Sequence, residues 1–113
     1  MAKKRTKTIP VVRGSGNVFA DLGFAQPEEE LTKAKLASLI RKAIERKQLT
    51  QASAGEIMGI DQPKVSALLN GRLGNFSSER LMRLLTALGQ DVKITVRPKP
   101  LGREHGRIQV VAL

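Results

Sequence analysis

Apolar residues recur at three- and four-residue spacing in several stretches of the chain, the pattern of helices with one buried face. The longest stretch runs from Pro27 to about Lys47, and its apolar stripe comprises Leu36, Leu39, Ile40, Ala43 and Ile44. Proline followed by three glutamates is typical of a helix start, because proline fits the first turn and acidic groups suit its positive dipole end. We therefore predict one long helix over this range.

Two short helices are predicted next, over residues 51–58 and 62 to about 70. Each has a capping residue before it and a glycine after it, Thr50 and Gly59 for the first, Asp61 and Gly71 for the second. A fourth helix is expected after Ser77, with one apolar face that ends before Gly89 and is formed by Leu81, Leu84, Leu85 and Leu88. The central part of the chain is therefore predicted to be helical.

The pattern changes beyond Gly89. Val92, Ile94 and Val96 alternate with polar residues, which predicts a β-strand over residues 91–97. A lone strand leaves its backbone N–H and C=O groups unpaired, so we expect it to pair with the same strand of a second copy. The alternative is a local hairpin with residues 107–112.

The two ends of the chain have a different character. Residues 1–16 are basic and close on two glycines, which predicts a flexible arm that either contacts a polyanion or is simply solvated. Asn17 can cap a short helix over residues 18–22. We expect one domain over residues 17–98, followed by a tail over residues 99–113.

Composition narrows the function classes. The net charge of +10 favours a polyanionic partner, either nucleic acid or an anionic membrane surface. The chain has no cysteine and three aromatic residues, which excludes thiolate chemistry and disfavours proteins that bind single strands by stacking on bases. No apolar run is long enough to span a bilayer and no secretory signal is evident, so we expect a cytoplasmic protein.

The segment from Gln51 to Asn70 carries the most specific signal. Gly55 and Gly59 are placed to let two short helices cross at a tight turn, and Val65, Leu68 and Leu69 are placed to anchor the second helix. The outer side chains of that helix can then hydrogen-bond base edges in a major groove. The expected DNA-binding residues are Gln51, Asp61, Gln62, Pro63, Lys64, Ser66, Asn70 and Arg72.

Residues 49–71, LTQASAGEIMGIDQPKVSALLNG, resemble the helix-turn-helix of lambda-repressor-like (Cro/CI, or XRE) proteins. The matching positions are Leu49, Thr50, Gln51, Gly59, Ile60, Gln62, Val65, Ser66, Leu68 and Gly71. The flanking segments GNVFADLGF and FSSERLMRLLTALGQDVKITVRP resemble HigA-type antitoxins, so the likeness covers about residues 16–98. One departure is Gly55, where the family usually has alanine, and another is Ala54, where it has a larger aliphatic residue.

The resemblance implies a mainly α, lambda-repressor-like bundle of four to five helices with a C-terminal β-strand used in dimerisation. It also implies a homodimer on a palindromic operator in double-stranded DNA, and a toxin partner that is a RelE/HigB-like ribonuclease. The alternative is a solitary XRE-type repressor without a toxin. Residues 18–31 are the expected toxin-binding surface, because the helix-turn-helix does not need them.

Phosphate contacts are expected from Lys3, Lys4, Arg5, Lys64, Arg72 and Arg80. An enzymatic function is not expected. His105 is the only histidine, it lies among glycines and arginines, and no carboxylate cluster has the spacing of metal ligands. No cofactor, metal or membrane partner is expected either.

Overall fold

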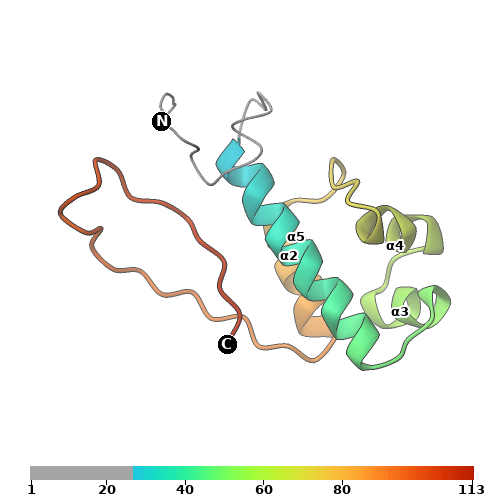
Figure 1. Ribbon diagram of the computed structural model, residues 1–113. Coiled ribbons are helices and arrows are strands. Elements are labelled where there is room, and N and C mark those ends of the chain that lie inside the picture. Colours follow the sequence, from blue (N-terminus) through green and yellow to red (C-terminus); the bar gives the residue numbers. More distant parts are fainter. Residues whose placement is uncertain (1–26) are drawn as a thin grey trace. The chain divides into compact units, whose positions relative to one another are not determined.

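Helix α2 (Pro27–Arg46) is the longest element in the computed structural model, which describes residues 27–113. Figure 1 shows it followed by two short helices, α3 (Gln51–Met58) and α4 (Gln62–Leu69), and by the longer α5 (Ser78–Ala87). The chain divides into two compact units, residues 1–31 and 32–113. Of the first unit, the structure describes only residues 27–31, which form the beginning of α2.

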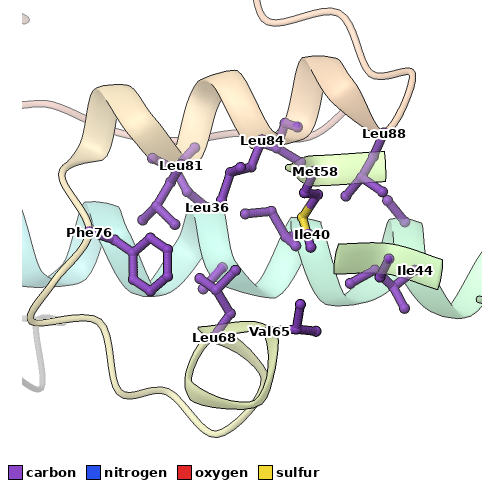
Figure 2. Packing of buried hydrophobic residues seen from close by; sticks show 14 of the residues in the cluster. Leu36, Ile40, Ile44, Met58, Val65, Leu68, Phe76, Leu81, Leu84 and Leu88 are labelled. Atoms are coloured by element: carbon purple, nitrogen blue, oxygen red, sulfur yellow. The ribbon is translucent and has the colours of Figure 1, made fainter. Parts of the chain in front are cut away.

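The hydrophobic core is built by the faces that the sequence pattern predicted. Figure 2 shows leucines of α5 pointing toward the apolar side chains of α2, with Val65 and Leu68 of α4 entering from another side. The largest fully buried side chains are Ile40, Leu68, Leu81, Leu88 and Val65. Burial of one such side chain contributes about 1.5–3 kcal/mol. This core fixes the short helices on the long one.

The helix ends are closed by the residues that the sequence indicated. The hydroxyl oxygens of Thr50 and Ser77 accept hydrogen bonds from the backbone N–H groups of Ser53 and Arg80, each at 3.0 Å. The carboxylate of Asp61 accepts from the N–H of Lys64, also at 3.0 Å. Each bond satisfies an N–H that has no partner inside its own helix. The four predicted helices of residues 27–89 are therefore confirmed, with ends within a residue or so.

The predicted C-terminal strand is not seen. In Figure 1 the chain continues beyond α5 as an extended trace, and residues 90–113 contain neither helix nor strand. Within this segment the Arg103 N–H donates to the Pro100 oxygen at 3.2 Å, in a turn. A strand needs a neighbour for its backbone groups, and the prolines at 98 and 100 offer no N–H to one. The alternative hairpin with residues 107–112 does not form either.

The tail is nevertheless not detached from the domain. Val110 packs partly buried against the hydrophobic core, whereas Ile94 and Val96 are 74% and 90% exposed. The alternating apolar side of residues 91–97 is therefore left in solvent. No segment among residues 27–113 pairs with it as a strand.

Some expectations lie outside the described residues, namely the basic arm 1–16 and the short helix 18–22. Among residues 27–113, no helix is long and apolar enough to cross a membrane. The same residues contain no group of three histidine or acidic side chains arranged to hold a metal ion.

Candidate nucleic-acid interface

Gly59 forms the tight turn between α3 and α4. Its φ of 73° lies in the left-handed region, which glycine adopts without the steric cost that a side chain would bring. Its N–H donates to the Gly55 oxygen, and the N–H of Ile60 donates to the same oxygen at 3.0 Å. The chain can therefore leave α3 and enter α4 within three residues.

The inner sides of α3 and α4 are closed by small and apolar residues. Ala54, Gly55 and Met58 of α3 are buried, and Ile60 in the turn is half-buried against the core. Ile57 of α3 lies outside this core, since its side chain is 45% exposed. It lies next to buried Met58 on a helix in which neighbouring side chains point about 100° apart, so it faces outward.

Helix α4 presents opposite chemistry on its two sides. Val65 and Leu68 are 0% and 2% exposed, and both lie in the core. Gln62, Pro63 and Lys64 at the start of the helix are exposed. Because the inner side is fixed by burial, the position of the exposed first turn is fixed with it. This turn has the amide and ammonium groups that can bind base edges or phosphate oxygens.

Asp61 and Lys64 form a local pair at the start of α4. One carboxylate oxygen of Asp61 caps the helix, and the other lies 3.6 Å from the Lys64 Nζ. Both side chains are largely exposed, so the pair contributes little stability. The pairing leaves Lys64 able to exchange this partner for a phosphate or a base.

Asn70 and Ser66 are brought together at the other end of α4. The Asn70 amide Nδ2 donates to the Ser66 backbone oxygen at 2.9 Å and to its hydroxyl at 3.3 Å. The amide predicted to read a base therefore binds its own helix in the free protein. A role for Asn70 in base recognition stays a prediction, and it requires the exposed amide to give up its hydrogen bonds to Ser66.

The two remaining predicted residues, Gln51 and Arg72, lie before and after α4 in the sequence. Gln51 is half-buried in the first turn of α3, and Arg72 is exposed just after α4. The backbone N–H of Arg72 donates to the Ala67 oxygen at 2.9 Å, which holds its backbone close to the end of α4. The backbone of Arg72 is therefore fixed by this hydrogen bond.

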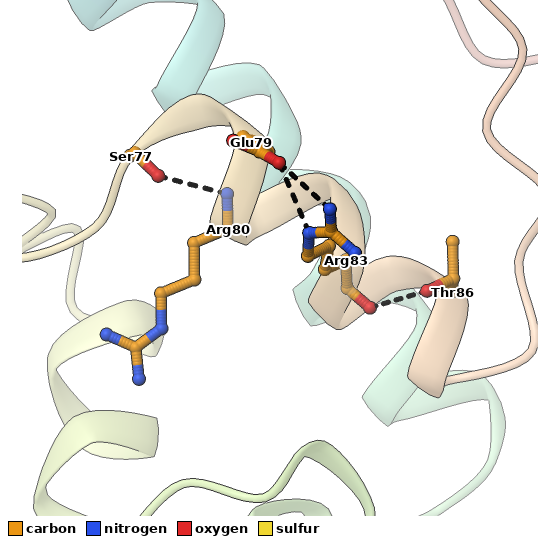
Figure 3. Close-up of polar contacts among 5 residues, drawn as sticks. All are labelled: Ser77, Glu79, Arg80, Arg83 and Thr86. Carbon is orange, nitrogen blue, oxygen red and sulfur yellow. Dashed lines mark hydrogen bonds and ion pairs between the residues drawn. The ribbon is translucent and has the colours of Figure 1, made fainter.

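The two arginines of α5 have different environments. The guanidinium of Arg83 binds the Glu79 carboxylate at 2.9 Å. In Figure 3 the Arg80 side chain extends away from this pair. Its guanidinium carbon lies 5.2 Å from the centre of the Phe76 ring, a cation–π distance. Stacking on Phe76 limits the motion of Arg80 but leaves its charge without competition from Glu79, which suits a phosphate contact.

Two further basic residues, Lys33 and Arg41, lie on α2. The structure places Arg41 next to the last residue of α4 and Lys33 next to Leu73, in the loop that follows. The Arg41 guanidinium donates to the Leu69 oxygen, and the Lys33 ammonium donates to the Leu73 oxygen at 3.4 Å. Sequence spacing gives no signal for these contacts, since their partners are backbone atoms about 30 to 40 residues away.

This arrangement is also found in known helix-turn-helix proteins. A family model described as a helix-turn-helix domain matches residues 18–97. A solved structure named as a candidate XRE-family transcriptional regulator is 53% identical and superposes with a TM-score of 0.73. The similarity covers 76% of this chain and 97% of that one. A comparison with curated proteins gave no match.

Proposed function

Since this chain belongs to the XRE-like helix-turn-helix family, we propose that it is a transcriptional regulator that binds duplex DNA in a sequence-specific way. The observation that carries the proposal is the two-sided character of α4. Val65 and Leu68 fix the helix in the core, and Gln62 and Lys64 stand exposed at its N-terminal turn. Glutamine can pair with adenine in the major groove, and lysine with guanine or phosphate.

The charge of the chain supports a phosphate-bound complex. Lysine and arginine together number 20 against 10 acidic residues. Lys64 is exposed on α4, Arg72 is exposed just after this helix, and Arg80 lies over the Phe76 ring. The other phosphate candidates, Lys3, Lys4 and Arg5, lie outside the described residues. Each phosphate neutralised releases counterions, so affinity should fall steeply with salt.

The protein acts, in this proposal, as a homodimer on a palindromic operator. Residues 91–97 have an exposed apolar side and no strand partner among residues 27–113. Pairing with the same segment of a second copy would satisfy the backbone groups and cover Ile94 and Val96. Two copies of α4 would then enter successive major grooves about 34 Å apart.

An autoregulating antitoxin is the more specific form of the proposal, with a RelE/HigB-like ribonuclease as the toxin. The support is the resemblance of the segments around the helix-turn-helix to HigA-type antitoxins. Residues 18–31, the expected toxin-binding surface, lie mostly outside the described residues. The protein would act by binding rather than by catalysis in either role. The alternative is a solitary repressor that uses the same scaffold without a toxin.

One experiment separates these roles. The tagged full chain is expressed with its neighbouring open reading frames and purified, and the product is tested by mobility shift on the upstream promoter fragment. A specific shift with a stoichiometric small partner supports the antitoxin. A specific shift without a partner supports the solitary repressor, and the absence of any specific shift would contradict DNA-binding regulation.

A further inference from the structure

Two cationic side chains of α2 bind backbone oxygens on either side of the turn that follows α4. Arg41 donates to the oxygen of Leu69, the last residue of α4. Lys33 donates to the oxygen of Leu73. The three residues between these anchors are Asn70, Gly71 and Arg72, two of which are candidate DNA contacts.

Arg41 binds a carbonyl oxygen in the last turn of α4. A helix leaves its final carbonyl groups without partners in the helix itself. The oxygens of Ser66, Ala67 and Leu68 accept backbone N–H groups from Asn70, Arg72 and Gly71, respectively, at 2.9–3.2 Å. The Leu69 oxygen is bound by Arg41. The side chain from α2 therefore completes the closure of α4 and brings a positive charge to its negative dipole end.

Lys33 anchors the far side of the same turn. Lys33 is only 8% exposed. Lysine is rarely buried unless its ammonium group has a partner, and here the Leu73 oxygen is one. The Leu73 oxygen that it binds also accepts the N–H of Phe76 at 3.0 Å, and the Leu73 side chain is buried. The contact therefore connects α2 to the start of the loop that leads to α5.

We propose that Arg41 and Lys33 are positioning residues for DNA recognition, which hold the end of α4 and Arg72 in the orientation needed for base-specific contact. The inference rests on the proposed DNA-binding function. It assigns these two cations to backbone oxygens and not to DNA phosphates. A loss of either contact should loosen residues 69–73 and weaken discrimination between sequences, while the attraction to any duplex remains.

The test uses full-length Arg41→Met, which keeps an apolar stem but cannot donate. Arg41→Lys is the conservative variant, and Lys42→Gln is the matched control, since Lys42 is exposed on the same helix. Each protein is titrated with a duplex selected from a random library by the wild-type chain and with an unselected duplex, over a range of salt concentrations. Amide hydrogen exchange of the free protein is measured by NMR.

We expect Arg41→Met to bind the selected duplex about tenfold more weakly and the unselected duplex within about twofold of wild type. The salt slope should stay unchanged, and Arg41→Lys should recover part of the loss. In the free protein the Arg72 amide should exchange about tenfold faster, while the Leu88 amide in α5 keeps its rate. Lys42→Gln should leave the Arg72 exchange and the ratio between the two duplexes unchanged.

Equal losses on both duplexes, with a salt slope smaller by about 0.9, would identify Arg41 as a phosphate ligand and overturn the proposal. Unchanged exchange at Arg72 would overturn it as well. If the wild-type chain does not distinguish the duplexes, the proposed function fails, and the exchange data still decide whether Arg41 holds this turn. Lys33→Met, tested in the same way, should loosen the turn without lowering the salt slope.

Discussion

The backbone oxygen of Ile60 lies 2.7 Å from the position that a Cβ atom on Gly55 would occupy. The Val65 Cγ2 methyl lies 3.4 Å from the same position. The turn after α3 therefore folds back directly over Gly55, and the N–H of Ile60 donates to the Gly55 oxygen. The close crossing of α3 and α4 depends on the absence of a side chain at residue 55.

Gly55→Ala should destabilise the protein even though alanine is the better helix former. Alanine in a helix gains about 1 kcal/mol over glycine, but a displaced backbone oxygen in a packed region costs about 1–3 kcal/mol. We expect a net loss of about 1 kcal/mol in the free energy of unfolding by urea denaturation. Gly74→Ala is the control, since a Cβ there meets nothing within 4 Å. Equal or greater stability of Gly55→Ala would show that the turn can shift freely.

We expect Asp61 to stabilise the folded protein through its helix cap rather than through its ion pair with Lys64. Asp61→Asn keeps an oxygen that can cap α4, so stability should change little, whereas Asp61→Ala should lose about 0.5–2 kcal/mol in thermal unfolding. Asp61 is itself one of the predicted DNA contacts, and Asp61→Asn replaces its negative charge with a neutral amide, so the affinity of the variant for the DNA polyanion should rise. A similar loss of stability in both variants would mean that the ion pair, and not the cap, stabilises this turn.

Gln62→Ala and Lys64→Ala test the exposed turn of α4 directly. Each should lose about 1–3 kcal/mol of binding free energy on the selected duplex and relax the base preference at one position. The measurement is competition binding against duplexes that differ at single base pairs. A control is Ala52→Ser, at an exposed position on α3. Equal weakening on selected and random duplexes would instead indicate that the two residues contact only phosphate.

If the protein is the proposed homodimer, removal of residues 91–113 should give a monomer and weaken operator binding strongly, because two half-sites would no longer be bound together. The deletion also removes Val110 from the core, so a second variant is needed. Ile94→Lys with Val96→Lys retains Val110 and changes only exposed side chains. Both proteins should be monomeric by light scattering, and a persistent dimer would place the dimer interface elsewhere.

The sequence by itself determined the helical part of this protein. Apolar spacing and the caps at Thr50, Asp61 and Ser77 depend on residues close together in the chain, so they predict where helices begin and end. The position of Gly59 directly after the first short helix likewise predicted the turn between α3 and α4. The first turn of α4 was predicted as exposed for the same reason, because Val65 and Leu68 must face inward.

Only the tertiary structure decided what depends on distant partners. Residues 91–97 have the alternation of a strand, but a strand forms only where another segment accepts its hydrogen bonds, and residues 27–113 provide none. Arg41 looks like any exposed arginine in sequence, yet folding brings it to the Leu69 oxygen. Local pattern specifies helices because their backbone bonds are local, whereas the anchoring of α4 relies on contacts across the fold.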